Sequence, residues 1–360
     1  MAIFNPSTLT LETAELKSSA EAVFESAFAK PQLDKLNTIV NGIMSKQKIA
    51  ILGRFQGLLG AGSGECDPSA SSTTIKASQK VWEPATISDR LTYCWTDLEQ
   101  TFFVWGLKKG VQKADLTGTD FLVFVEELLS DALIETYLRI AYFNDKDAAA
   151  TDDSPAGNIT AGTNLNFFNR IDGIFKQIFA IVAADSNRLT TGIASRNGQA
   201  SFAAQAFTDT DTTNKVVTKT LQNMKYGADM RLRGKANLVY IATQSVVDQY
   251  ERELIASEAN FTIDRLENGF TVLKNGGIEV IGFDFWDRII RTYFSNGTKY
   301  YLPHRIILST PENLQIATEE ASALSGYDVF YDKKTKTTNV DFQFNLDAKV
   351  VEDHMVQVAY

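Results

Sequence analysis

The chain has 360 residues, of which 44% are hydrophobic and 22% charged, and its 35 basic and 44 acidic side chains give a net charge of −9. This apolar fraction is too high for an intrinsically disordered protein. The acidity excludes a general nucleic-acid-binding surface, which needs clustered positive charge. Only two histidines are present, which leaves little material for histidine-based catalysis or a histidine-rich metal site.

Targeting and membrane patterns are absent from the sequence. Residues Met1–Thr10 contain no basic patch followed by an apolar run, so we expect no signal peptide. The longest strongly apolar stretch, Phe121–Val125, is far shorter than the roughly 18 residues of a membrane span. The two cysteines, Cys66 and Cys94, fit no metal-ligand spacing and are expected to be reduced thiols.

The N-terminal segment, residues 10–47, has the periodicity of amphipathic helices. Apolar residues recur at steps of three and four on both sides of Pro31, which interrupts the pattern. The pattern after the proline consists of Leu33, Leu36, Val40 and Ile43. We therefore predict two helices whose apolar stripes pack on this chain or on a neighbouring one.

The next segment changes to the period of two that is typical of β-strands. Apolar residues alternate with polar ones up to residue 95, and Thr73–Val81 is also compatible with a strand. With Pro84 between the two stretches, we predict a two-stranded ribbon. Because an isolated ribbon is marginally stable in water, its apolar face is expected to pack on another surface. Residues on that face include Ile87, Leu91, Tyr93 and Trp95.

The clearest helix is predicted over residues 119–143, where apolar residues from Phe121 to Ile140 form one stripe. At about 1.5 Å per residue it spans roughly 35 Å, enough to cross a domain. A loop at 144–164 and a shorter helix at Phe167–Ala184 follow.

The second half of the chain predicts a mixture of helices and strands. A helix at Val216–Arg233, a buried strand at Leu238–Ala242 and a helix at Gln244–Ser257 follow an irregular segment, Asn197–Lys215. Asn-Gly pairs favour tight hairpin turns. They predict one hairpin around Asn275-Gly276 and a second around Asn296-Gly297, with strands at Arg291–Phe294 and Lys299–Leu302. The final predicted strands are Arg305–Ser309, Asp328–Tyr331 and Val340–Val350.

Sequence signatures of catalysis do not fit. Gly60–Gly64 lacks the third glycine of a dinucleotide-binding loop, and the glycines at 227 and 234 have the wrong spacing for a phosphate loop. His304 and His354 are isolated, so we predict structural roles for both. The sequence therefore predicts no catalytic, cofactor-binding or metal-binding residues, and its abundance of packing residues is typical of an assembly subunit.

The order of these elements resembles that of a tailed-bacteriophage major capsid protein with the Hong Kong 97 fold. The segments that carry the resemblance are Phe167–Gln177, Ala236–Ala242, Gly277–Gly282, Ile306–Leu314 and Asp328–Tyr360. The resemblance implies an α+β fold of five parts. These are an N-terminal arm at 1–47, an E-loop region with an extended β-ribbon at 48–116, a P-domain with a long spine helix at 117–170, an A-domain at 171–325, and a C-terminal β-segment of the P-domain at 326–360.

The resemblance also implies a function. Such a protein forms pentamers and hexamers of an icosahedral shell, and the shell encloses double-stranded DNA without sequence-specific binding. No cofactor or membrane is involved, whereas a portal and scaffold or decoration proteins are further partners. The subunit assembles in the host cytoplasm and resides in the virion capsid. The ribbon would lie across a neighbouring subunit, which makes Ile87, Leu91, Tyr93 and Trp95 candidate inter-subunit contacts.

Two alternatives remain open at this point. The first is an encapsulin-like bacterial compartment, which shares the fold but encloses protein cargo. The second is a cytoplasmic α+β enzyme of another class. An enzyme is expected to form small oligomers, whereas a shell protein forms capsomers or megadalton particles.

Overall fold

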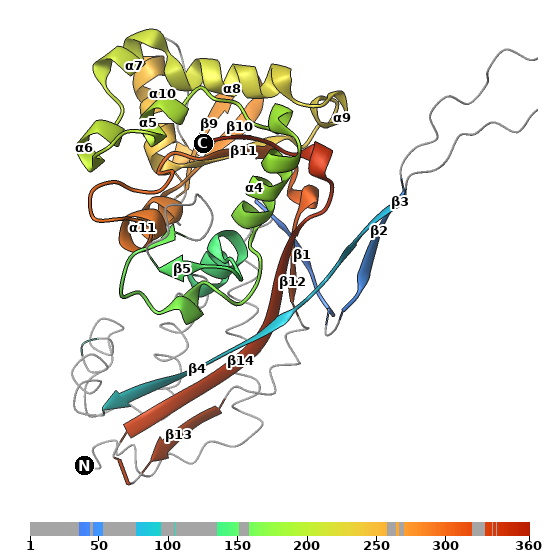
Figure 1. Cartoon of the computed structure of the whole chain (residues 1–360), viewed down its shortest axis with the longest axis vertical. Coiled ribbons are helices and arrows are strands. Elements are labelled where there is room, and N and C mark those ends of the chain that lie inside the picture. The colour runs from blue at the N-terminus through green and yellow to red at the C-terminus, as the bar shows by residue number, and fades with distance from the viewer. Residues whose placement is uncertain are drawn as a thin grey trace, which may run out of the picture.

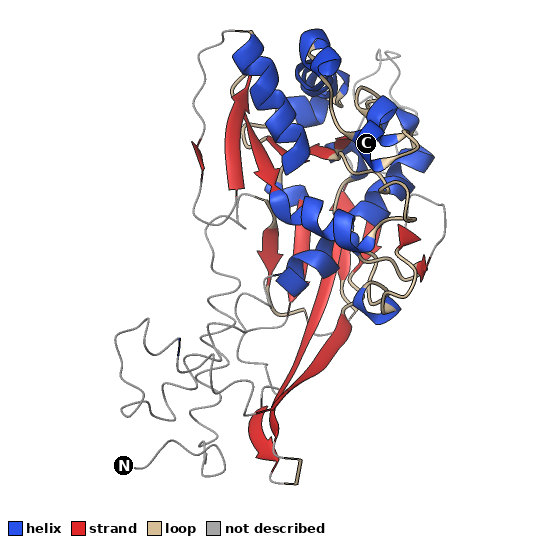
Figure 2. Ribbon diagram, turned by 90° about the vertical axis from the view of Figure 1, so that its left-hand side faces the viewer, coloured by secondary structure: helices blue, strands red, loops and turns tan. Residues whose placement is uncertain are grey.

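A computed structural model describes residues 36–43, 46–52, 77–94, 104, 135–150, 158–257, 264–265, 270–318, 328–332, 334–335 and 337–360. Two larger sheets and a set of helices make up these parts of the chain, which confirms the predicted α+β class (Figure 1). The helices gather around the six-stranded sheet, and the longest strand of the five-stranded sheet extends away from them (Figures 1 and 2).

The six-stranded sheet has the strand order β15-β11-β7-β10-β9-β8. Its members are β7 (Val239–Thr243), β8 (Asp264–Arg265), β9 (Phe270–Asn275), β10 (Ile278–Phe283), β11 (Ile306–Ser309) and β15 (Gln357–Ala359). Every residue of β7 is buried, as its continuous apolar run predicts. The strands of this sheet come from distant parts of the chain, so its core depends on long-range contacts.

Helices cover both faces of this sheet. Alternate residues of a strand point to opposite faces. Accordingly, Val239 and Ile241 pack with α4 (Ile174–Ala184) and α11 (Asp284–Tyr293), while Tyr240 packs on the opposite side with the two remaining long helices. These are α8 (Val216–Gly227) and α10 (Gln244–Ala256). Two covered faces explain why β7 has no polar alternation.

The five-stranded sheet contains the longest strand of the described residues. It is formed by β1 (Thr38–Val40), β4 (Ala85–Cys94), β12 (Leu314–Thr318), β13 (Asp328–Asp332) and β14 (Thr337–Val350). One end of β14 pairs with β12, and its other end pairs with β4 and β13. The side chain of Gln177 on α4 bonds to the backbone of Ala348 and Val350, which fixes this end of β14 to the helices.

Shorter elements complete the described fold. Residues 135–143 are helical, which confirms the last part of the predicted long helix; the rest of that helix lies outside the described residues. The remaining strands are β2 (Lys48–Leu52), β3 (Ala77–Val81), β5 (Ala149–Ala150) and β6 (Asn158–Ile159). The remaining short helices are η3 (Leu165–Phe167), η4 (Ser186–Arg188), α5 (Ala194–Asn197), α6 (Phe202–Gln205), α7 (Asp209–Asn214), α9 (Met230–Arg233), η5 (Pro311–Asn313) and η7 (Asp353–Met355).

The predicted ribbon is correct in its strands and wrong in their pairing. β3 and β4 both form, but β3 pairs with β2 and β4 pairs with β14. The chain passes from one strand to the next without reversing direction (Figure 1). The connecting residues Trp82, Glu83 and Pro84 include a buried tryptophan and make no hairpin turn. Proline at this point therefore marks a passage between two sheets.

Two further predictions are wrong in secondary structure. Residues Thr38–Val40, predicted as helix, form β1 because they hydrogen-bond in register with β12. Residues Arg291–Phe294, predicted as a strand, form the end of α11 and its cap. The turn at Asn296-Gly297 is present, with Gly297 at φ +88° and a bridge between Ser295 and Tyr300, but it does not join two strands.

Several boundaries also differ from the predictions. α4 begins at Ile174 because Gly173, its N-cap residue, lies against the backbone of Asn144. The predicted irregular segment at 197–215 includes α6 and α7. The first Asn-Gly hairpin forms, but the positive φ angles belong to Gly276 and Gly277, at +56° and +84°.

Candidate functional site

The pairing of β4 with β14 is the first candidate functional feature. Ten residues of β4, Ala85–Cys94, pair antiparallel with Leu346–Thr337, and we call this unit the β4–β14 ladder. Across it, Arg90 forms a two-pronged ion pair with Asp341, with both N···O distances 2.5 Å. The Asp341 carboxylate raises the pKa of Arg90. Cross-strand pairs of this kind help to fix the register of a sheet.

A group of contacts fixes the base of the ladder, where β3 leads into β4. Trp82 is buried beside Ile43 and Ala317. The backbone N–H of Glu83 donates to Asp347 Oδ2 at 2.7 Å. The Glu83 carboxylate pairs with two lysines, Lys46 at 3.3 Å and Lys146 at 3.2 Å, which lower its pKa. The base of the ladder is therefore fixed to β12 and β14 of its own sheet and to the segments around Ile43 and Lys146.

The structure describes the four predicted contact residues unequally: one with its side chain, two by their backbone alone, and one not at all. Ile87 is 8% exposed and belongs to the core of its own chain, opposite Phe344. The backbone register places Leu91 opposite Val340 and Tyr93 opposite Thr338, while their side chains lie outside the described residues. Trp95 also lies outside the described residues. An inter-subunit role for these residues stays a prediction.

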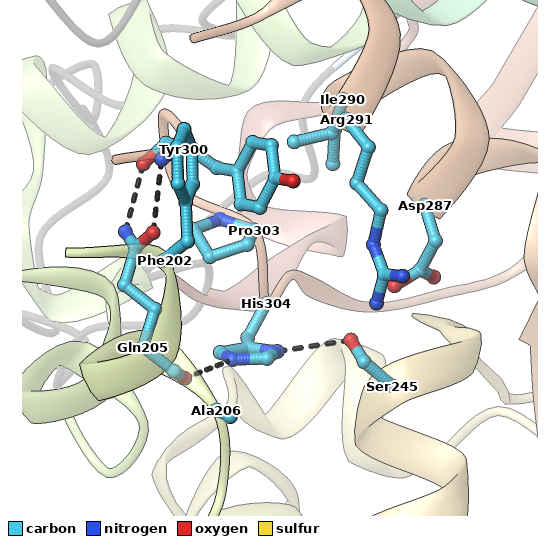
Figure 3. Close-up of a pocket in the computed structure, with 10 residues that line it drawn as sticks. All are labelled: Phe202, Gln205, Ala206, Ser245, Asp287, Ile290, Arg291, Tyr300, Pro303 and His304. Atoms are coloured by element: carbon cyan, nitrogen blue, oxygen red, sulfur yellow. Dashed lines mark hydrogen bonds between the residues drawn. The ribbon is translucent and has the colours of Figure 1, made fainter. Parts of the chain in front are cut away.

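The second candidate feature is a pocket between α6, α10 and α11 (Figure 3). His304 lies at its floor, where its Nδ1 atom is 2.9 Å from Ser245 Oγ and its Nε2 atom is 2.8 Å from the backbone oxygen of Gln205. A carbonyl oxygen only accepts, so Nε2 carries the proton and Nδ1 accepts from the serine hydroxyl. Asp287 accepts a hydrogen bond of 2.6 Å from the backbone N–H of Gln244, at the start of α10.

The electrostatics of this pocket do not fit nucleophilic catalysis. Burial lowers the pKa of His304 to about 4, which makes it a poor base near neutral pH. In a serine hydrolase a carboxylate holds the ring N–H of the histidine. Here the neutral carbonyl of Gln205 does so, and Asp287 bonds instead to the first residues of α10. The arrangement joins α6, α10 and the residue before β11, in agreement with the structural role predicted for His304.

Residues of this pocket other than His304 were not predictable from a sequence motif. Gln205, Ser245 and Asp287 belong to separate elements and share no local motif. Burial raises the pKa of Asp287 to about 6. A helical spacing of Phe285, Trp286, Ile289 and Ile290 would have indicated α11, and its first-turn aspartates are typical of a helix start.

A buried arginine next to the pocket was also missed. Arg305 lies with its guanidinium carbon 4.5 Å from the centre of the Phe175 ring, and it donates to the backbone oxygens of Tyr301 and Leu302 at 3.1 and 2.8 Å. Burial lowers its pKa to about 9. These contacts stabilise the Arg305 cation in an apolar core. We therefore interpret Arg305 as a structural residue and not as a substrate-binding one.

Metal-ligating clusters and membrane-spanning helices can be assessed for the described residues. Among them, no group of three or more histidine, cysteine, aspartate or glutamate side chains is arranged to hold a metal ion. None of the helices in these parts of the chain has the length and apolar character needed to cross a membrane.

Comparisons with known proteins address the fold as a whole. No protein-family model and no curated protein matches the chain. The chain is similar to the holo-SrpI encapsulin complex from Synechococcus elongatus (TM-score 0.46, 9% identity, 92% of this chain and 88% of that chain). It is also similar to a structure of Gordonia phage Cozz (TM-score 0.48, 10% identity, 91% and 85%).

The similarity that defines the fold is to a chain of the satellite phage P4 procapsid, a structure that includes the size determination (Sid) protein. The TM-score is 0.53 at 13% sequence identity, over 98% of this chain and 92% of that chain. This chain therefore shares, over nearly its whole length, the fold of a phage procapsid chain.

Proposed function

We propose that this chain is the major capsid protein of a tailed phage. The observation that carries the proposal is the fold shared with a phage P4 procapsid chain over 98% of the present chain. In this proposal the protein forms pentamers and hexamers of an icosahedral head shell around double-stranded DNA, and it resides in the virion. Its partners are further copies of itself, a portal, and scaffold or decoration proteins.

The proposed parts of the subunit follow the division of the Hong Kong 97 fold. Residues 1–47 form the N-terminal arm, 48–116 the E-loop region, 117–170 the P-domain with the spine helix, 171–325 the A-domain, and 326–360 the C-terminal β-segment. The six-stranded sheet supports an A-domain, since five of its strands and the helices on both faces fall within 171–325. β15, at Gln357–Ala359, joins this sheet from the C-terminal segment.

The β4–β14 ladder supports the proposed assembly role. It extends away from the helices (Figures 1 and 2), and β4 has a polar, exposed set of residues at Thr86, Ser88, Arg90 and Thr92. A long strand pair outside the helical body is suited to contact a neighbouring copy. Many such contacts, each weak, give a stable shell because multivalency raises the overall strength.

An enzymatic role is not part of this proposal. The Ser245–His304 pair lacks a base with a pKa near neutrality, and the Asp287 carboxylate is bonded to the N-terminus of α10. The proposed function needs packing surfaces and no reaction, which agrees with the large share of buried aromatic and aliphatic side chains in the described residues.

The test uses charged substitutions on β4 and its continuation. Leu91→Asp and Trp95→Asp are each expected to leave the subunit soluble but to prevent particles, because a carboxylate is costly in an apolar contact. Thr210→Asp, at an exposed position of α7 outside the β4–β14 ladder, is the control and is expected to assemble as the unmodified protein does. Size-exclusion chromatography and negative-stain electron microscopy provide the measurements.

The outcomes separate the possible explanations. Shells of normal size from both Leu91→Asp and Trp95→Asp would remove the assembly role of this strand. An unmodified protein that forms only small oligomers would contradict the shell function itself. Protein cargo instead of DNA inside purified native particles would favour the encapsulin-like alternative.

A further inference from the structure

Residues 215–235 form a segment of this acidic chain that is rich in positive charge. Residues 215–235 contain six basic residues and one acidic residue, a net charge of +5 in a protein whose net charge is −9. The segment consists of α8, α9 and the residues that flank them. The net charge of the whole chain hides this local excess of positive charge. The overall acidity therefore does not exclude a local surface that binds nucleic acid.

The fold turns the basic residues of α8 outward. Its buried face, formed by Val217, Thr220, Leu221 and Met224, packs toward the six-stranded sheet. Lys215, at the N-cap of α8, and Lys219 and Tyr226 on the helix are separated by four and seven residues, so they follow one stripe on the opposite side. All three are exposed. Figure 1 shows α8 as an outer element of the molecule, with α9 at its end.

The stripe continues into α9. Arg231, Arg233 and Lys235 are exposed, and the Arg233 guanidinium lies 5.7 Å from the centre of the Tyr226 ring. Tyr226 is 65% exposed. We define the basic stripe as Lys215, Lys219, Lys225, Arg231, Arg233 and Lys235, with Tyr226 between its two halves.

Little of this charge is neutralised by the acidic residue of the same segment. Asp229 pairs with Arg231 at 3.4 Å and also with Arg188 at 3.6 Å, from outside the stripe. Lys225 donates to the backbone oxygen of Gly276, and Arg233 donates to that of Tyr226; both acceptors are neutral. The net positive charge is therefore available to a polyanion.

We infer that the basic stripe binds the phosphate backbone of double-stranded DNA without reading its sequence. Lysine and arginine contacts to phosphates supply this kind of binding, and the released counterions make it dependent on salt. The choice of DNA as the polyanion rests on the proposed capsid function. The length of α8, 12 residues or about 18 Å, spans several phosphates of one duplex groove edge.

The test measures binding of the full-length protein to a fluorescently labelled DNA duplex of mixed sequence, by anisotropy over a series of salt concentrations. The test variant is Lys219→Gln with Arg233→Gln, because glutamine preserves helix propensity and removes both charges. The control is Arg170→Gln with Arg252→Gln, which removes two exposed arginines from other elements. Each phosphate that is no longer neutralised is expected to reduce the slope of log affinity against log salt by about 0.9.

The test variant is therefore expected to reduce this slope by about two and the affinity at low salt by roughly tenfold or more, while the control changes little. An equal slope for the two variants would overturn the inference. So would binding to polyglutamate that a DNA duplex does not compete for, which would assign the stripe to an acidic protein.

Electron microscopy of the same preparations keeps this inference separate from the proposed function. If the unmodified protein forms shells and the stripe variant still binds DNA normally, only the inferred DNA contact is overturned. DNA binding that depends on the stripe, in a protein that never forms shells, would overturn the capsid function.

Discussion

The two larger sheets of this protein bury the residues of their strands to different extents. In the six-stranded sheet, β7 and β11 are buried at every residue, since helices cover both faces. In the five-stranded sheet, β4 alternates between buried Ile87 and exposed Ser88 and Arg90. The first region completes its core from its own helices. The second presents a polar surface along β4, and it is this surface that we propose contacts other copies.

Two tryptophans show the same contrast. Trp286 on α11 is fully buried, with ring-centre distances of 4.9 Å to Tyr142, 4.9 Å to Phe175 and 5.6 Å to Phe283. Trp82, between β3 and β4, is 3% exposed but belongs to a much smaller buried cluster. Substitutions in the two regions test whether this difference in surroundings governs stability.

The largest effect is expected for Trp286→Ala. Removing the ring leaves a cavity among several aromatic side chains that cannot all close around it, so the free energy of unfolding should fall by about 3–5 kcal/mol. Urea denaturation followed by circular dichroism measures this. Trp286→Phe is the control and should lose far less, because the indole N–H has no acceptor among the described residues. Equal losses for the two variants would contradict the cavity argument.

A pH-dependent effect is expected at His304. Its pKa is lowered to about 4 by burial, whereas an exposed histidine titrates near 6.5. Between these values the unfolded chain binds a proton that the folded chain does not, so the stability associated with neutral His304 is lost as pH falls from 6.5 to 4. The loss is at most about 3 kcal/mol.

Glutamine at this position does not titrate, so His304→Gln should lose less stability than the unmodified protein over that interval. Asp287, whose pKa is raised to about 6, has the opposite effect on stability in both proteins. Its carboxyl group binds a proton more tightly in the folded state than in the unfolded state, so this group favours folding as pH falls through 6. Denaturation at pH 7, 5.5 and 4 provides the comparison. Parallel pH profiles for the two proteins would show that His304 does not contribute.

A smaller effect is expected for Trp82→Ala, the counterpart of Trp286→Ala. Its surroundings are Ile43 and Ala317, with Val40 and Ile49 partly buried beside them. Because few of the described side chains pack on this ring, we expect the free energy of unfolding to fall by about 2 kcal/mol. A loss as large as that of Trp286→Ala, measured by the same urea titration, would remove the distinction between the two regions.

The smallest effect is expected for Arg90→Gln on the β4–β14 ladder. Arg90 and Asp341 form an ion pair at the surface, where solvent and salt screen the attraction. The urea midpoint should therefore be unchanged within error at physiological salt. A clear destabilisation that high salt abolishes would show that this pair contributes more to the ladder than its exposure predicts.

Local signals in the sequence predicted a large part of the fold. The apolar run at 238–242 correctly indicates a strand covered on both faces, and the Asn-Gly-Gly turn at 275–277 indicates the hairpin of β9 and β10. The period of two correctly indicates β14. In each case the residues that determine the element are neighbours in the chain.

Partners distant in the sequence were not predictable by the same means. β4 has the pattern of a ribbon strand, but its partner, β14, is about 250 residues away, as the Arg90–Asp341 pair shows. The pocket around His304 has the same origin, since Gln205, Ser245 and Asp287 meet only in the folded chain. The residues of the basic stripe are close together in the sequence at 215–235, but their exposure depends on which face of α8 packs on the sheet.

Electron microscopy of the purified unmodified protein tests the central claim most directly. We predict closed, icosahedral particles of megadalton mass, in which the subunits cluster around fivefold and sixfold centres. A uniform small oligomer, under conditions where the protein is folded and concentrated, would contradict the proposal that this chain builds a capsid shell.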